Sequence, residues 1–374
     1  MPIQYRKIGN RKKLRFTRRT FILSTAAVAL GIASCQPQAQ QTPTGATTPA
    51  ASPVADAGAN ITLTGAGASF PAPLYQLWFA EYNKKNPNVQ INYQSIGSGA
   101  GIQQFIKGTV DFAASDVAMT KEEIAQVEQG VILLPMTAGS IVVAYNIPDI
   151  KTGLRLPRDV FTDIFLGNIK NWNDARIANA NKDIKLPNLP INVVHRSDGS
   201  GTTSVFTEHL SAISPQWKSK VGAGRSVSWP AGSGAKGNEG VTAQIQQNQG
   251  TIGYVEYSFA KKNNLAMAAL QNKAGNFIMP TPEAATKTLA AVELPENLVA
   301  FITDPEGAES YPIVTYTWLL AYDNYKDPKE AETLKSVIEW ALTDGQKFSA
   351  ELGYIPLPEK VVEKAKAAAN RIVS

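Results

Sequence analysis

Residues 191–206, INVVHRSDGSGTTSVF, contain the pattern from which we predict the fold of this chain. Its first part is rich in β-branched residues, which favour a strand, and its second part is a run of Gly, Ser and Thr of the kind that opens a helix. Backbone N–H groups at a helix start have no partner within the helix, and glycines let a ligand approach them closely. This segment therefore predicts a strand, a turn suited to an anion and a helix, in that order.

Two other segments follow the same pattern. Residues 64–71, TGAGASFP, end in a proline that suits the first position of a helix, and residues 96–101, IGSGAG, follow a strand predicted at 89–93. A single Gly/Ser cluster is more often a plain cap or turn than a binding site. Three such clusters in one chain favour a dedicated receptor for an oxyanion.

Strand-like and helix-like runs alternate along the body of the chain. Helices are predicted between the strands and in the last part of the chain, where Pro358 opens the final helix. A length of 374 residues allows two domains. Together these features predict an α/β fold with two lobes and mostly parallel sheets, in which a ligand lies beyond the carboxyl ends of the strands. The predicted strands are 89–93, 141–145, 191–194, 252–255 and 313–320.

The first 34 residues have the order of an export signal. Eight of the 36 basic residues precede Ser34, no acidic residue does, and an apolar run at 21–32 follows the basic part. Without this segment 28 basic residues face 31 acidic ones, so the net charge changes from +5 to −3. A basic arm that binds nucleic acid is the alternative interpretation, and the apolar run that follows argues against it.

The single cysteine, Cys35, stands where the apolar run ends. Residues 32–35, IASC, resemble the site at which a lipoprotein signal is cut and the cysteine receives lipid, and residues 17–23 resemble a twin-arginine export signal. The following residues, 36–60, are rich in Pro, Thr, Ala and Gln and hold few large apolar side chains, which predicts a flexible tether. We therefore expect an exported protein, periplasmic or on the outer face of the cell membrane, that is held there by lipid.

Six segments taken together resemble the high-affinity phosphate-binding proteins of bacterial phosphate uptake. The resemblance runs in order over nearly the whole body. It implies the two-lobed architecture of periplasmic binding proteins, with a hinged cleft that closes on phosphate, and delivery of phosphate to the permease subunits of an ATP-binding-cassette transporter. The segments are TGAGASFPAPLYQLW (64–78), INYQSIGSGAG (91–101), VDFAASD (110–116), HRSDGSGTT (195–203), SWPAGSGAKGNEG (228–240) and TIGYVEYSFAKKNNL (251–265).

The same resemblance implies a domain division and a set of ligand residues. The chain is expected to cross between lobes near 138–145 and near 312–318. The expected division is a signal peptide at 1–34, a lipidated cysteine and linker at 35–60, a discontinuous first lobe at 61–140 and 313–374, and a second lobe at 141–312. The expected phosphate-binding residues are Ser69, Phe70, Ser98, Asp116, Arg196, Ser200, Gly201 and Thr202, with Asp198 as the partner of Arg196.

Two members of this set have distinct chemistry. Arg196 offers a planar, charge-assisted pair of donors to two anion oxygens. Asp116 is unexpected beside an anion, and without the resemblance it would be interpreted as a cap at a strand end. Phosphate near neutral pH keeps a proton that a carboxylate can accept, whereas sulfate has none, so Asp116 is predicted to reject sulfate. Ser69 stands where the family often has threonine, which leaves a less restricted hydroxyl.

Other functions fit the sequence less well. Ser233 and Lys236 have the spacing of the nucleophile and lysine of penicillin-binding hydrolases, but the Lys-Thr-Gly element at 151–153 comes before them rather than after. The histidines, His195 and His209, form no cluster with acids at metal-ligand spacing. A structural surface module would explain the tether but not three anion-type helix starts. We expect a monomeric binding protein without enzymatic activity, cofactor, metal or nucleic-acid partner, and transport and phosphate sensing remain open as alternatives.

Overall fold

The computed structural model describes residues 60–374. The predicted signal peptide, Cys35 and all but the last residue of the tether lie outside this range. The main sheet contains β1 (Ile61–Gly67), β2 (Val89–Ser95), β3 (Phe112–Ser115), β4 (Ile132–Tyr145), β6 (Asn192–Arg196), β7 (Ser233–Ala235), β8 (Thr251–Glu256), β9 (Ala266–Met267) and β12 (Val314–Ala321), and a second sheet contains β5 (Arg155–Leu156), β10 (Ala269–Gln271) and β11 (Phe277–Ile278).

Thirteen helices connect and cover these strands within the described range. They are α1 (Ala72–Lys85), α2 (Ser98–Ile106), α3 (Lys121–Ile124), α4 (Arg158–Phe165), α5 (Ala175–Ala180), α6 (Gly201–Ile213), α7 (Pro215–Lys220), α8 (Gly237–Gln247), α9 (Tyr257–Lys262), α10 (Pro282–Ala290), α11 (Pro328–Leu342), α12 (Gln346–Leu352) and α13 (Glu359–Ala369). The predicted strands and helices are present with small differences at their ends, except that the strand predicted at 141–145 is the second part of the longer β4, which begins at Ile132. Helix α1, for example, begins at Ala72 because Pro71 lies in the turn before it.

The main sheet confirms the predicted α/β class. Its path is β2-β1-β3-β12-β4-β8-β6-β7, with β9 paired to β4. Pairing is parallel on both flanks, where β1 contacts β2 and β3 and where β6 contacts β7 and β8. These parallel pairs follow from strand–helix–strand connections. Pairing is antiparallel at the centre, where β12 lies between β3 and β4 and β4 contacts β8.

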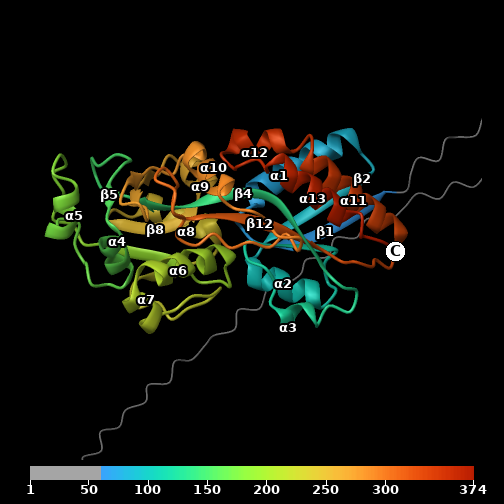
Figure 1. Ribbon diagram of the computed structural model, residues 1–374, viewed down its shortest axis with the longest axis horizontal. Coiled ribbons are helices and arrows are strands. Elements are labelled where there is room, and N and C mark those ends of the chain that lie inside the picture. Colours follow the sequence, from blue (N-terminus) through green and yellow to red (C-terminus); the bar gives the residue numbers. More distant parts are fainter. Residues whose placement is uncertain (1–59) are drawn as a thin grey trace, which may run out of the picture. The chain divides into compact units, whose positions relative to one another are not determined.

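Strand β4 connects two α/β halves. Its residues 132–140 pair with β12, whereas 141–145 pair with β8. Figure 1 shows β4 and β12 side by side, with α1, α2, α11 and α13 around one end and α4, α6, α8 and α9 around the other. The pairing changes between Ser140 and Ile141, inside the range where a crossing was expected. From this change of partner we propose that the chain divides into a discontinuous lobe at 61–140 and 313–374 and a second lobe at 141–312.

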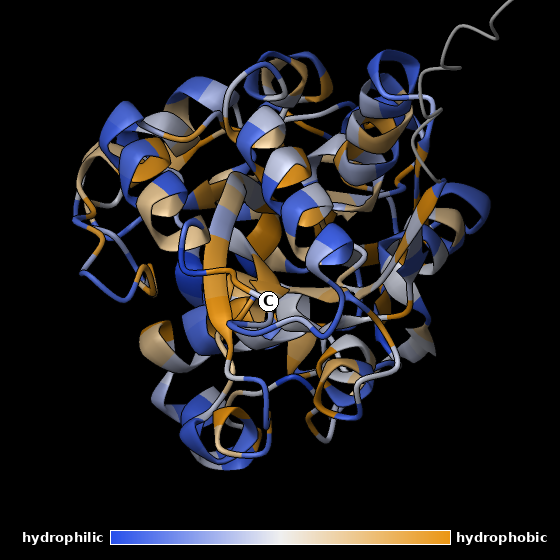
Figure 2. Cartoon of the chain, turned by 90° about the vertical axis from the view of Figure 1, so that its right-hand side faces the viewer, coloured by the Kyte–Doolittle hydropathy of each residue, from blue (hydrophilic) through white to orange (hydrophobic). Residues whose placement is uncertain are grey.

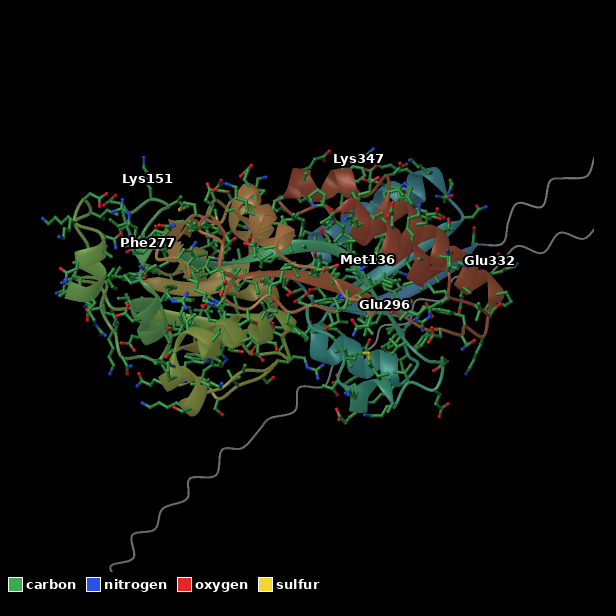
Figure 3. All side chains as sticks on the ribbon, viewed as in Figure 1. Met136, Lys151, Phe277, Glu296, Glu332 and Lys347 are labelled. Atoms are coloured by element: carbon green, nitrogen blue, oxygen red, sulfur yellow. The ribbon has the colours of Figure 1, made fainter. Side chains whose placement is uncertain are left out.

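The core lies between the central strands and the helices that cover them. Strands β3, β8 and β12 are buried at every residue, as expected for strands covered on both faces. Figure 2 shows the apolar strands inside and helices whose outward faces are hydrophilic. Charged side chains such as Lys151 and Lys347 are exposed and project outward in Figure 3. This core fixes the strand ends from which the candidate site is built.

Candidate anion-binding site

The predicted site residues lie at strand ends and helix starts near the sheet centre. Ser69 follows β1, Ser98 begins α2, and Asp116 follows β3. Strands β1, β2 and β3 are neighbours and parallel, so their carboxyl ends meet at one edge of the sheet. Arg196 ends β6 and Ser200 caps α6, whose first turn contains Gly201 and Thr202. Local sequence thus places each residue at the end of an element, as predicted.

Direct hydrogen bonds join the site segments that precede β4 in the chain to those that follow it. The backbone N–H of Gly201 donates to Ser98 Oγ over 3.0 Å. Thr202 Oγ1 donates to Asp116 Oδ2 over 3.0 Å. The N–H of Gly99 donates to the carbonyl of Gly199 over 2.8 Å. The N–H of Gly97 donates to the carbonyl of Gly67 over 2.8 Å. Residues of the first four segments of the resemblance (64–78, 91–101, 110–116 and 195–203) therefore form one continuous group.

Two glycines permit this close approach. A Cβ on Gly201 would lie 2.6 Å from Ser98 Oγ and 2.8 Å from the Cβ of Asp116. Gly97 has a φ of +93°, and a Cβ there would lie 2.3 Å from Asp198 Oδ2. Any larger residue would have to displace backbone or side chains that belong to the site. The Gly-rich composition of these turns is therefore a requirement of the packing.

Arg196 is the buried cation of the site. Its side chain is 1% exposed. Nε donates to Asp198 Oδ1 over 2.7 Å, and Nη2 donates to Asp198 Oδ2. Nη1 is buried and has no partner among the described residues. Because a buried donor without a partner is unfavourable, Nη1 is suited to receive an anionic oxygen.

Asp198 holds Arg196 in place through both oxygens of its carboxylate. It also accepts the backbone N–H of Gly237 over 3.0 Å. Burial works to raise the pKa of Asp198, but the hydrogen bonds and charge of Arg196 outweigh it and hold the pKa below its usual value. Asp198 is therefore ionised at neutral pH and orients the guanidinium.

Asp116 is a buried acid in the same group. Thr317 Oγ1 donates to its Oδ1 and Thr202 Oγ1 to its Oδ2, both over 3.0 Å. Burial raises the pKa of Asp116 to about 6, although these hydroxyls and the charge of Arg196 work to lower it. Each carboxylate oxygen has two acceptor sites, so Asp116 can still accept a proton from a ligand.

Three serine hydroxyls accept hydrogen bonds from protein N–H groups. Ser69 Oγ accepts from the backbone N–H and the Nδ2 of Asn238, over 3.0 and 2.9 Å. Ser98 Oγ accepts from Gly201 and, over 3.4 Å, from the N–H of Asp116. Ser200 Oγ accepts from the N–H of Thr203 over 3.0 Å. A hydroxyl that already accepts has its own proton to donate, so each serine is suited to contact an acceptor such as an anion.

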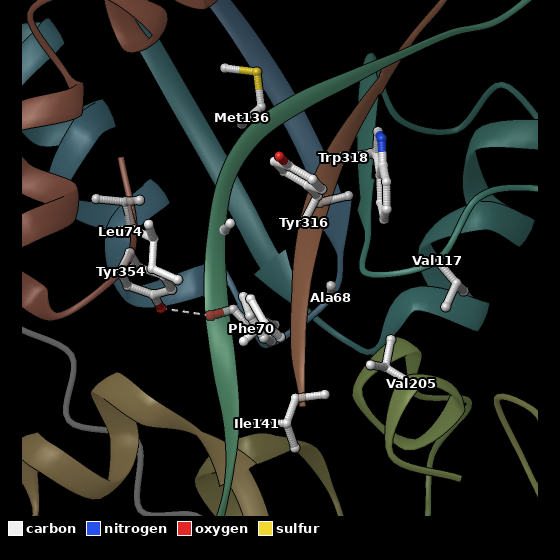
Figure 4. Packing of buried hydrophobic residues seen from close by; sticks show 14 of the residues in the cluster. Ala68, Phe70, Leu74, Val117, Met136, Ile141, Val205, Tyr316, Trp318 and Tyr354 are labelled. Atoms are coloured by element: carbon white, nitrogen blue, oxygen red, sulfur yellow. Dashed lines mark hydrogen bonds between the residues drawn. The ribbon is translucent and has the colours of Figure 1, made fainter. Parts of the chain in front are cut away.

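Phe70 is anchored where β4 and the C-terminal part of the chain meet. Its carbonyl accepts from the hydroxyl of Tyr354 over 2.6 Å, as Figure 4 shows. A Cβ on Gly139 would lie 2.8 Å from its ring, so the ring packs directly against β4. Both contacts fix the backbone next to Ser69.

The sequence did not identify three residues that complete the group. Thr317 lies on β12 and reaches Asp116. Asn238 is the second residue of α8 and holds Ser69. Tyr254 on β8 accepts the N–H of Arg196 over 3.1 Å and bonds Thr203 Oγ1 over 2.6 Å. Thr317 gave a signal, because it and Thr315 are the two threonines of an otherwise apolar strand, whereas the partners of Asn238 and Tyr254 are set by the fold.

Two of the residues weighed for other chemistry, His195 and Lys236, directly precede Arg196 and Gly237 in the chain. Ser233 and Lys236 are exposed, and no hydrogen bond joins their side chains. His195 stacks on Trp229 with ring centroids 4.7 Å apart. Burial lowers the pKa of His209 to about 4. Within residues 60–374 there is no group of three or more His, Cys, Asp or Glu that could hold a metal, and no helix there combines the length and hydropathy needed to cross a membrane.

The chain matches one family model and is similar in sequence to several curated proteins. The PBP superfamily domain matches residues 37–345. The phosphate-binding protein PstS of Pasteurella multocida is 45% identical over 309 residues, covering 82% of this chain and 89% of that protein. PstS of Xylella fastidiosa is 41% identical over 356 residues, covering 93% and 96%. PstS of Methanocaldococcus jannaschii is 41% identical over 332 residues, covering 82% and 85%.

Solved structures share the fold at lower sequence identity. A high-affinity periplasmic phosphate-binding protein with bound phosphate has a TM-score of 0.67 and 19% identity, covering 82% of this chain and 93% of that one. A phosphate-binding protein from Stenotrophomonas maltophilia has a TM-score of 0.65, 19% identity and the same coverage. The two-lobed α/β architecture is therefore shared with these structures.

Proposed function

This chain belongs to the PBP superfamily and, within it, to the PstS family of phosphate-binding proteins, and on that premise we propose that it binds inorganic phosphate at the site around Arg196 and Asp116. The observation that carries the proposal is the buried Nη1 of Arg196, a charged donor without a described partner, in the same group as a buried acid. Such a pair suits a ligand that is an anion and also carries a proton. The ligand residues are the eight predicted from the sequence, supported by Asp198.

Phosphate fits both halves of this site. Its oxygens can accept from Arg196, from the serine hydroxyls and from helix-start N–H groups. Its remaining proton can be donated to Asp116. Sulfate meets the same donors but places an unprotonated oxygen against a carboxylate in a buried site. The site should therefore select phosphate by charge rather than by size.

The test compares phosphate and sulfate in the parent and in Asp116→Asn. Protein freed of carried ligand by unfolding and refolding is titrated calorimetrically with each anion at one pH and salt concentration. Asn keeps an oxygen for the phosphate proton and adds an N–H for sulfate. Relief of an unsatisfied buried contact, about 1–3 kcal/mol, together with relief of the charge clash, which costs more, should improve sulfate binding by at least about tenfold. An unchanged ratio of the two affinities would show that Asp116 is not the selective group, and failure of the parent to bind phosphate would refute the proposed ligand.

We further propose that the bound phosphate is delivered to the permease subunits of an ATP-binding-cassette transporter, without hydrolysis of any ester. The support is family membership together with the exposed and unconnected positions of Ser233 and Lys236. Phosphate uptake by cells that lack this protein and by complemented cells tests the role in transport. Turnover of a phosphate ester by the purified protein would contradict a role in binding alone.

Export and lipid anchoring are proposed from the sequence of the N-terminal segment. The order of a basic part, an apolar run and Cys35 supports a lipoprotein held at the outer face of the membrane. Mass spectrometry of the N-terminal peptide from the native host should find lipid on Cys35, and Cys35→Ser should release the protein from membranes. An unmodified Cys35 in membrane-bound protein would contradict the anchor.

A further inference from the structure

Asn238 uses its backbone N–H and both ends of its carboxamide to connect two parts of the candidate site. It is fully buried in the first turn of α8. Its backbone N–H and its Nδ2 both donate to Ser69 Oγ, over 3.0 and 2.9 Å. Its Oδ1 accepts the backbone N–H of Glu256 over 2.8 Å. The side chain thus spans from the end of β8 to the residue that follows β1.

The contact with Glu256 determines which way the carboxamide points. A backbone N–H can only donate, so the group that faces it must be the oxygen of Asn238. The Nδ2 end must then face Ser69, and the assignment of the amide does not depend on an arbitrary choice between nitrogen and oxygen. Ser69 Oγ therefore receives two N–H donors from one residue.

This arrangement leaves Ser69 with one remaining function. A hydroxyl has two acceptor sites and one proton, and both acceptor sites are occupied by Asn238. Ser69 is 1% exposed, and no residue of the described range accepts its proton. A buried O–H without an acceptor is unfavourable, so it should donate to whatever occupies the site.

The start of α8 also connects the contact between Asn238 and Ser69 to the cation Arg196. Gly237, the residue before Asn238, donates its N–H to Asp198 Oδ1 over 3.0 Å, and Asp198 holds Arg196. Gly237 has a φ of +70°, a conformation that glycine adopts without strain. Two consecutive N–H groups at the start of α8 therefore hold the partner of Arg196 and the hydroxyl of Ser69.

We propose that Asn238 is a positioning residue that makes the Ser69 hydroxyl an obligate donor to the bound anion. Asn238 acts through Ser69 and needs no contact with the ligand itself. A serine hydroxyl otherwise turns freely about its C–O bond and can present either a lone pair or its proton. By filling both lone pairs before the ligand arrives, Asn238 removes that freedom and pre-organises the donor. The inference rests on the proposed binding of phosphate.

The decisive substitution is Asn238→Asp. It preserves shape and retains an oxygen for the N–H of Glu256, but it replaces the Nδ2 donor with an acceptor that can take the Ser69 proton. Calorimetric titration with inorganic phosphate at pH 8 should show affinity reduced by about tenfold or more. At that pH the new carboxyl is ionised unless burial raises its pKa by about four units.

A double-mutant cycle separates positioning from the added charge. A carboxylate at position 238 repels the anion whether or not Ser69 has a hydroxyl, so that effect cancels between the two backgrounds. In the Ser69→Ala background we expect Asn238→Asp to reduce affinity at least about fivefold less than it does in the parent. Asn238→Ala, which only frees one lone pair, should cause a smaller loss in the parent and none beyond about twofold in Ser69→Ala.

Controls keep the outcomes distinct. Asn248→Asp makes the same chemical change at the exposed other end of α8, where Nδ2 contacts Gln244, and should leave affinity within about twofold of the parent. Thermal unfolding of each variant identifies any that fail to fold, in which case the alanine pair decides. Equal losses in both backgrounds would overturn the positioning role while phosphate binding by the parent stands. If the parent itself does not bind phosphate, the proposed function fails instead.

Discussion

Replacing Arg196 with alanine should abolish most of the affinity for phosphate. The guanidinium has five N–H donors, and Asp198 occupies one on Nε and one on Nη2, which leaves three, including both on the buried Nη1. Two charge-assisted bonds from Nη1 at about 1.5–3 kcal/mol each give about 3–6 kcal/mol, a loss of about 10²–10⁴-fold in affinity. Arg196→Lys should recover only part, because an ammonium cannot bind Asp198 and the anion with the same planar fork.

The truncation also exposes the ligand to the uncompensated charge of Asp198. The double substitution Arg196→Ala with Asp198→Ala removes both charges, so it should bind phosphate more tightly than Arg196→Ala alone and more weakly than the parent. Arg371→Ala is a matched control, because that arginine pairs with Asp323 over 2.8 Å on the surface and its side chain is 61% exposed. Calorimetric titration with phosphate measures the parent and all four variants. Affinity of Arg196→Ala within about threefold of the parent would show that the anion binds elsewhere.

Two further predictions concern the rate of phosphate release and the dependence of stability on pH. Arg225 pairs with Glu123, and the Arg225 carbonyl accepts the N–H of Ser200 over 2.8 Å, so this pair connects the cap of α6 to α3. Arg225→Leu should speed phosphate release by about twofold to tenfold in stopped-flow measurements. An unchanged rate would show that this ion pair does not slow the release of phosphate. Burial raises the pKa of Glu256 to about 8, so the folded protein retains a proton that the unfolded chain releases above its usual pKa of 4.5. Stability should therefore fall as pH rises from about 4.5 to 8, and Glu256→Gln should flatten this slope in denaturant unfolding curves; a slope equal to that of the parent would contradict the assignment.

Short-range features of the site were accessible from the sequence because they depend on neighbouring residues. A Gly/Ser/Thr run after β-branched residues specifies a strand, a cap and a helix start wherever the chain goes. Ser200 does cap α6 through the N–H of Thr203, and β2, β6 and β8 lie at the predicted positions. The assignment of ligand residues also came from the sequence, through the resemblance, and their contact with phosphate remains a prediction.

The tertiary structure alone decided which of these residues meet and in what state. Thr317 reaches Asp116 across 201 positions of sequence, and Asn238 reaches Ser69 across 169. Periodicity reports which face of an element is buried, but it does not report strand order, so it could not place β12 between β3 and β4 or predict antiparallel pairing at the centre of the sheet. The raised pKa of Asp116 and the free Nη1 of Arg196 depend in turn on burial and on partners that only this strand order supplies.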